Sequence, residues 1–122
     1  MKWILALNAF VFLGFGLFSL YSPVGLLSLI GVFMSPTGAI EIRAMYGGLE
    51  LGICAFLFLC IRRNWVEQGV YFSLLAVGGL FAARLFCMIC FDGATPILWK
   101  ACAAEGIATV INSMALMKLK KS

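Results

Sequence analysis

Three charged side chains lie inside long apolar runs of this sequence: Glu50, Arg84 and Glu105. The chain has only nine basic and five acidic residues, and most of the others lie at chain ends or in short connections. If the apolar runs cross a membrane, each buried charge costs about 2.5–3.5 kcal/mol. Such a residue needs a partner of opposite charge, a water-filled cavity or a function. These three residues therefore define the first candidate site.

Helical spacing places other polar residues beside these charges. In the second apolar run, residues spaced i, i+4, i+7 and i+11 share one face: Arg43, Gly47, Glu50 and Cys54, with Tyr46 beside them. The last run has a similar stripe: Cys102, Glu105, Thr109 and Asn112. Polar stripes on apolar helices should face the protein interior, so we predict one shared polar pocket. Its expected members are Arg43, Tyr46, Glu50, Arg84, Glu105 and Thr109.

Two interpretations of this pocket stay open. In the first, two carboxylates and two guanidinium groups pair and fix the register of the helices, although such pairing adds little net stability. In the second, the pocket faces outward and binds a small polar or lipid-like ligand. Because the sequence contains no histidine, it lacks the commonest metal ligand and the usual general base. We therefore predict no metal, no cofactor and no catalytic residue.

Two of the five cysteines, Cys87 and Cys90, form a Cys-x-x-Cys pair near the expected outer end of the third run. On an oxidising side of a membrane, such a dithiol could carry out redox chemistry. Reactive pairs, however, gain acidity at a helix N-terminus or beside cations, whereas this pair lies near a helix C-terminus. Cysteine also serves as an ordinary small apolar residue. A redox role is therefore the alternative, and metal binding is disfavoured.

The elements that must position these residues are membrane helices. The 122 residues are 64% hydrophobic and 11% charged, against about 25% charged residues in soluble proteins. Four apolar runs cover 3–21, 40–61, 66–91 and 96–117, each near the roughly 20 residues that span a bilayer. Alternating strands are absent, so the spans must be helices. We predict an all-α fold, a single domain over 1–122 that forms a transmembrane four-helix bundle.

The connection between the first two spans contains a further apolar run, 24–34, bounded by Pro23 and Pro36. This run is too short to cross a bilayer. We expect a short interfacial or re-entrant helix, with a kinked continuation of the first helix as the alternative.

The basic residues are distributed unevenly between the two ends of these spans. Six would lie on the side that holds both termini: Lys2, Arg62, Arg63, Lys118, Lys120 and Lys121. Only Arg43 and Lys100 would lie on the other side. The positive-inside rule therefore places both termini in the cytoplasm. The net charge of +4 is modest and concentrated at these ends, which indicates membrane topology and no nucleic-acid partner.

At 1.5 Å per residue, the three buried charges fall at similar depths. Glu50, Arg84 and Glu105 lie roughly 15, 12 and 13 Å below the outer surface. The predicted pocket therefore lies in the outer half of the bilayer.

Small residues indicate close helix packing. Gly48 and Gly52 form a GxxxG pair, Gly79 and Ala83 repeat its spacing, and Gly47 lies on the stripe of charged residues. Residue 48 lies about 200° around the helix from residue 50, so the GxxxG edge faces away from the charges. This edge could contact another helix, a second copy of the chain or a larger membrane complex.

The segment 41–52 resembles the signature of a family of small bacterial four-helix membrane proteins known as domain of unknown function 4345. Its sequence is Glu41-Ile-Arg-Ala-Met-Tyr-Gly-Gly-Leu-Glu-Leu-Gly. The resemblance implies a bundle distantly similar to DoxX-type proteins, some of which accompany quinone-linked oxidoreductases. It implies that the polar core contains Arg43, Tyr46, Gly47, Gly48 and Glu50. It carries no assigned activity, and the pair Cys87 and Cys90 is not part of the family pattern.

We therefore expect a bacterial inner-membrane protein without enzymatic activity. Its outward-facing pocket would bind a small ligand, a lipid or a quinone, or the chain would act as an accessory subunit of a membrane complex. The alternative is a membrane redox protein that uses the Cys87 and Cys90 dithiol. A proton-coupled transporter that works after oligomerisation comes third. The expected partners are the lipid bilayer and either further copies of the chain or a larger membrane complex.

Overall fold

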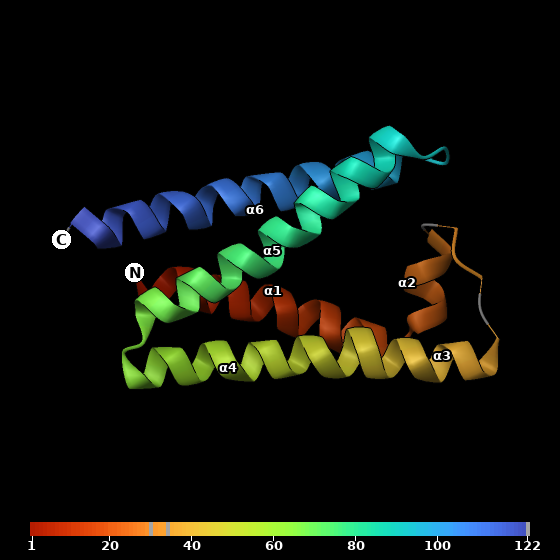
Figure 1. Ribbon diagram of the computed structural model, residues 1–122. Coiled ribbons are helices and arrows are strands. Elements are labelled where there is room, and N and C mark those ends of the chain that lie inside the picture. The colour runs from red at the N-terminus through yellow and green to blue at the C-terminus, as the bar shows by residue number, and fades with distance from the viewer. Residues whose placement is uncertain (30, 34, 122) are drawn as a thin grey trace.

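The structure is a computed structural model that describes residues 1–29, 31–33 and 35–121. The described residues form helices joined by short connections, without strands (Figure 1). In chain order they are α1 (Lys2–Tyr21), α2 (Pro23–Leu29), α3 (Pro36–Ile42), η1 (Arg43–Gly48), α4 (Leu49–Arg63), α5 (Val66–Cys90) and α6 (Pro96–Lys121). The prediction of an all-α fold is therefore confirmed for the described part of the chain.

Local sequence signals set the ends of these helices. Ser35 caps α3, because its Oγ accepts a hydrogen bond from the Gly38 amide at 3.1 Å. Pro36 follows at the first helical position, where its missing N–H costs nothing. Asn64 ends α4 in the left-handed conformation with φ of 59°, a common C-terminal cap. The Asn64 cap keeps the next connection short, since α4 ends at Arg63 and α5 begins at Val66.

A π-helical turn, η1, joins α3 to α4 into one continuous helix. In such a turn the backbone bonds run from i to i+5 instead of i to i+4, and such turns are frequent at functional sites. The turn contains Arg43, Tyr46, Gly47 and Gly48, all of which the sequence placed in the polar core or at a packing edge.

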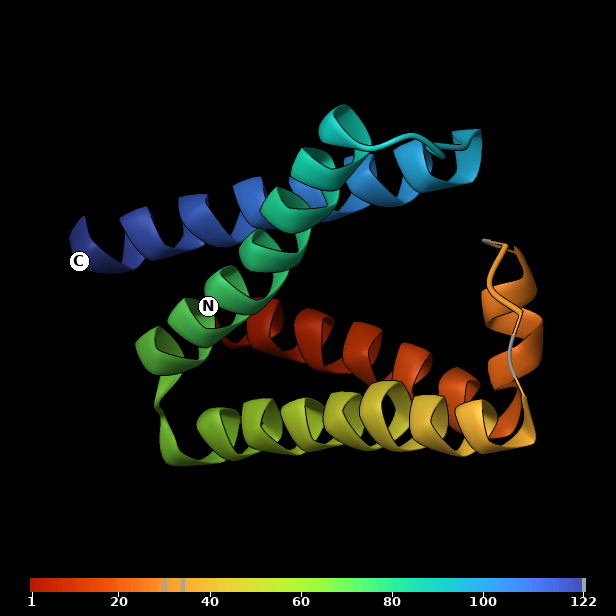
Figure 2. The same cartoon turned by 45° about the vertical axis from the view of Figure 1, so that its right-hand side comes forward.

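The helices are arranged as two pairs. The continuous helix α3–η1–α4 packs antiparallel along α1, and α5 packs along α6 (Figure 1). The α5 helix also contacts α1 and α4 at the end that holds both termini, and the two pairs diverge from there (Figure 2). Side-by-side packing of all four long helices, as expected of a four-helix bundle, is not confirmed.

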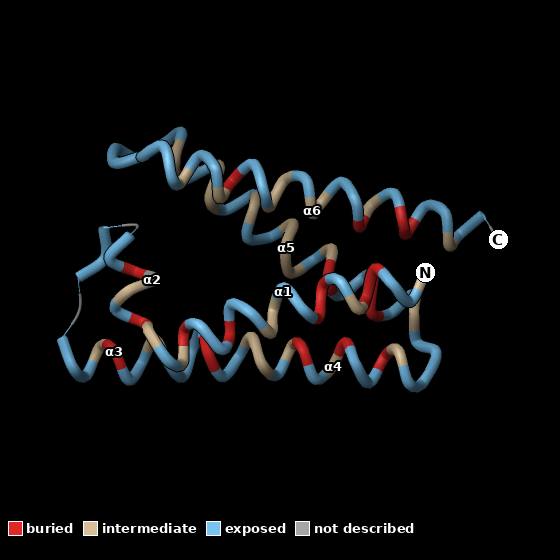
Figure 3. Tube along the Cα trace, turned by 180° about the vertical axis from the view of Figure 1, so that it is seen from behind, coloured by how far each residue is buried: buried red, intermediate tan, exposed pale blue. Residues whose placement is uncertain are grey.

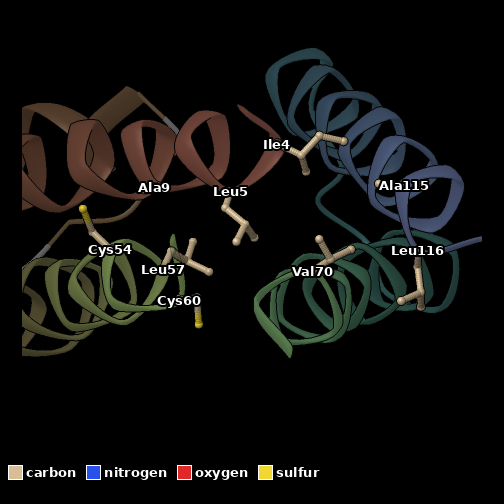
Figure 4. Close-up of a cluster of buried hydrophobic side chains, with 9 residues drawn as sticks. All are labelled: Ile4, Leu5, Ala9, Cys54, Leu57, Cys60, Val70, Ala115 and Leu116. Carbon is tan, nitrogen blue, oxygen red and sulfur yellow. The ribbon is translucent and has the colours of Figure 1, made fainter. Parts of the chain in front are cut away.

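The buried core lies where the two pairs meet. Buried positions are confined to the facing sides of the helices (Figure 3). The core cluster draws on α1, α4, α5 and α6 (Figure 4). Its members are Ile4, Leu5, Ala9, Cys54, Leu57, Cys60, Val70, Ala115 and Leu116. Many large apolar side chains elsewhere stay exposed, among them Phe10, Leu75 and Ile107, as expected where lipid replaces water.

Three helices are long and apolar enough to cross a membrane: Lys2–Tyr21, Pro36–Arg63 and Val66–Cys90. They correspond to the first three predicted spans. Within the described residues α6 is not among them, although it has 26 residues, because Lys100, Glu105 and Asn112 lower its hydropathy. The further apolar run between spans one and two contains the separate helix α2, of seven residues. Only Ser22 separates α2 from α1, which ends at Tyr21, so the interfacial or re-entrant helix and the kinked continuation both stay predictions.

Candidate functional site

Two of the three charges that lie within the apolar runs form an ion pair between α5 and α6. The Nε of Arg84 donates to both carboxylate oxygens of Glu105, at 3.0 Å to Oε1 and 2.9 Å to Oε2. The side chains are 26% and 15% exposed, so most of the pair is removed from the surroundings. In lipid, charges of opposite sign on neighbouring helices satisfy each other. The prediction that these two residues lie together is thus consistent with the geometry.

The Arg84 guanidinium keeps one edge free. An arginine carries five N–H donors, and only the Nε–H bonds to a side chain in the described part of the protein. The Nη groups are therefore available to hydrogen-bond a further acceptor.

Arg84 lines a cavity of about 430 Å³ between η1, α5 and the start of α6. Tyr46 approaches it from η1, and the walls include Leu80, Met88 and Leu98. The rim is formed by the α5–α6 connection, where Asp92 and Gly93 lie. The cavity thus combines one guanidinium edge and one phenol with a largely apolar wall. That combination suits an amphiphile with a polar head.

Glu50 does not join this pair. Its side chain is half-buried, its Oε2 is buried without a hydrogen-bond partner, and no ion pair with the described residues reaches it. Among the described residues Glu50 thus makes no hydrogen bond or ion pair with the other predicted pocket residues.

Arg43 bonds to α1 and not to either glutamate of the predicted pocket. Its Nε donates to the backbone carbonyl of Leu20 at 2.9 Å, in the last turn of α1. Carbonyls there have no helical partner, and a cation beside them is stabilised by the helix dipole. Arg43 thus caps α1, which is a structural role.

Thr109 bonds within its own helix. Its Oγ1 donates to the backbone carbonyl of Glu105 at 2.8 Å, and its methyl group faces Gly78 of α5. Thr109 therefore supports the helix that carries Glu105 without facing the cavity.

The predicted packing residues divide into two groups. A Cβ added to Gly47 would lie 2.6 Å from Cγ of Leu20, so Gly47 permits the close approach of α1. No described atom lies within 4 Å of the corresponding point at Gly48, Gly52 or Gly79. Gly48 and Gly52 instead line an open apolar groove of about 570 Å³, with Phe56 and Phe72 among its walls. Ala83 lines the Arg84 cavity.

The two cysteines of the Cys-x-x-Cys pair are free thiols and both are exposed at the end of α5. Cys87 lines the Arg84 cavity, whereas Cys90 does not. Among the described residues no group of three or more potential metal ligands comes together. The dithiol hypothesis stays a prediction.

Sequence reasoning missed one buried polar contact. Asn8 of α1 and Asn112 of α6 exchange hydrogen bonds, from Nδ2 of Asn8 to Oδ1 of Asn112 at 2.8 Å and in the reverse sense at 3.4 Å. Asn112 also donates to the carbonyl of Ala108 at 2.9 Å. Such amide pairs join membrane helices. The available signal was Asn8, a strongly polar residue in the middle of the first apolar run.

A family model described as domain of unknown function (DUF4345) matches residues 1–116, which is nearly the whole chain. Neither the curated proteins nor the solved structures give a match. The family match agrees with the resemblance found in segment 41–52.

Proposed function

The chain belongs to the DUF4345 family, and we propose from its geometry that it is a small multi-pass membrane protein that binds an amphiphile. The ligand head would lie at the free edge of Arg84, beside Tyr46. The observation that carries the proposal is the cavity of about 430 Å³ that Arg84 and Tyr46 line.

The charge around the cavity selects the kind of head group. Glu105 already neutralises Arg84 at 2.9 Å, and Asp92 adds a negative charge at the rim. An anionic head would meet no net positive charge there. A neutral hydrogen-bond acceptor, such as a quinone or ester carbonyl, can use the Nη–H donors without that repulsion. We therefore favour a neutral carbonyl compound with an apolar body, and a quinone belongs to this class.

The proposed topology has four crossings, with α6 as the fourth span and both termini in the cytoplasm of a bacterial inner membrane. The ion pair supports the fourth crossing, because it neutralises the charge of Glu105 that lowers the hydropathy of α6. The Arg84 cavity would then open toward the outer side. No catalytic step is proposed for it.

Binding can be tested with Trp99 as reporter, since Trp99 follows the cavity residue Leu98. In protein whose other two tryptophans are replaced by phenylalanine, decylubiquinone is titrated into lipid nanodiscs and the fluorescence of Trp99 is recorded. We expect saturable quenching, because a defined site fills while partition into lipid does not saturate. Ala83→Leu should abolish saturation by filling the cavity.

The matched control is Gly52→Leu, which fills the other groove and should leave the quenching curve unchanged. The double variant R84M/E105M removes the donor edge without leaving an unpaired charge, and saturation should be lost. Linear quenching in the parent protein, or equal saturation in the Ala83→Leu variant, would show that the cavity is not the binding site.

A second candidate function is that of an accessory subunit, and the apolar groove at Gly48 and Gly52 favours it. Small residues allow a partner helix to approach closely. In that case Gly52→Leu should reduce the size of the complex extracted in mild detergent, whereas Ala83→Leu should not. Equal sizes for both variants would refute it.

A further inference from the structure

Glu50 lies midway along the continuous helix Pro36–Arg63, one of the three helices able to cross a membrane. At 1.5 Å per residue it is roughly 20 Å from either end of that helix. This position corresponds to the centre of a bilayer whose hydrocarbon core is about 30 Å thick. A charge is least tolerated at this depth.

The carboxyl group of Glu50 has no partner among the described residues. Its Oε2 is buried and without a hydrogen bond, and the ion pair found in the described part of the chain belongs to Glu105. Two other buried polar atoms lack partners, the hydroxyls of Ser19 and Ser73. A serine in a helix can donate to the carbonyl one turn before it. A carboxylate needs a donor, and the amides of a helix interior are already used.

No charged group on the described elements packed against α4 forms an ion pair with Glu50. Arg43 of η1 is engaged by the Leu20 carbonyl, and Arg84 of α5 by Glu105. The basic residues Lys2, Arg62 and Arg63 lie at helix ends, as does Glu67. The remaining titratable groups on these helices are phenols and thiols: Tyr21, Tyr46, Tyr71, Cys54, Cys60, Cys87 and Cys90.

We propose that Glu50 is a proton-binding site, occupied by a proton at neutral pH and separate from the Arg84–Glu105 pair. A hydronium ion transfers its proton to the carboxylate: one O–H bond of the hydronium ion breaks, one O–H bond to the carboxylate oxygen forms, and a water molecule is released. Deprotonation reverses the step. The neutral acid avoids the cost of an unpaired charge in lipid, and the half-buried side chain leaves a path for exchange.

Infrared spectroscopy of the protein in lipid nanodiscs tests this proposal. We expect a carboxylic-acid C=O band at neutral pH that disappears reversibly as the pH is raised. The band should be absent from the Glu50→Gln variant and present in Glu105→Gln, the same substitution at the other intramembrane glutamate. A spectrum without the band, or a band that persists in Glu50→Gln, would overturn the proposal. Loss of the band in the Glu105→Gln variant would overturn the claim that the Glu50 site is separate from the Arg84–Glu105 pair.

A second measurement, chemical labelling of carboxyl groups, uses the wild-type protein alone and so does not depend on whether a variant folds. Dicyclohexylcarbodiimide enters membranes and reacts with protonated carboxyl groups, and peptide mass spectrometry locates the adduct. The wild-type protein should be modified at Glu50 and not at Glu105, with labelling that declines as the pH is raised. Labelling of Glu105 alone, or of neither residue, would contradict a protonated Glu50. Because no quinone is present, this result is independent of ligand binding at Arg84.

Discussion

Gly69 lies where α1, α4 and α5 converge, and replacing it with alanine tests that junction. A Cβ at this position would lie 2.8 and 2.9 Å from the two Cδ atoms of Leu5 and 3.2 Å from Cβ of Cys60. Carbon atoms pack best at roughly 3.5–4.0 Å. Leu5 and Cys60 are both fully buried, so neither can move without disturbing the core cluster.

The expected cost follows from two opposing effects. Overpacking a well-packed core costs about 1–3 kcal/mol, while replacing a helical glycine by alanine returns up to about 1 kcal/mol. Gly79→Ala, on the same helix, is the matched control because no described atom lies within 4 Å of its added Cβ. The unfolding free energies of the two variants should therefore differ by about 1–3 kcal/mol, with Gly69→Ala the less stable.

Reversible unfolding of the purified protein in mixed detergent and dodecyl sulfate micelles, followed by circular dichroism, measures this difference. A double-mutant cycle that combines Gly69→Ala with Leu5→Ala tests whether the contact with Leu5 causes this difference in stability. Removing the Leu5 methyl groups makes room, so Gly69→Ala should add little further cost in that background. Equal stability of the Gly69→Ala and Gly79→Ala variants, or an undiminished cost of Gly69→Ala in the Leu5→Ala background, would refute the close approach of α1 and α5.

Two further perturbations address the polar contacts. Asn8→Val should lower the unfolding free energy by about 1–2 kcal/mol because it leaves the Asn112 amide with one partner fewer. The double variant N8V/N112V should recover part of this loss. Additive losses in the two single variants and the double variant would argue against the pair. Arg43→Met should cost about 0.3–1 kcal/mol by removing the cap of α1, and should leave the Trp99 quenching curve unchanged. A shifted curve would instead assign Arg43 to the cavity.

The order and type of the elements could be predicted because their signals are local. Each long helix corresponds to an apolar run, and Pro23, Pro36 and Asn64 mark helix ends. That Arg84 and Glu105 lie close together could be predicted from the sequence for a similar reason. A regular rise of 1.5 Å per residue gives the depth of a residue on a helix, and opposite charges at equal depth on consecutive helices attract each other.

The bonding partners of the six predicted pocket residues could not be derived from the sequence, because that prediction assumed regular helical phase and equal packing of all four helices. The π-helical turn η1 departs from the spacing of 3.6 residues per turn that placed Arg43 and Glu50 on one face. The divergence of the two helix pairs leaves Glu50 without the charges on α5 and α6. The Asn8–Asn112 contact joins α1 to α6, and such long-range pairing carries no periodic signal.

The two glutamates within the apolar runs differ in their partners. Glu105 forms an ion pair with Arg84, which lines a cavity. Glu50 has no such partner among the described residues, so in our proposal a proton takes the place of the arginine. In this proposal the proton can leave whereas the arginine cannot, so Glu50 can change its charge without breaking a helix contact between the described residues. A response of this chain to pH would therefore begin at Glu50, while recognition of a neutral ligand at Arg84 would stay constant.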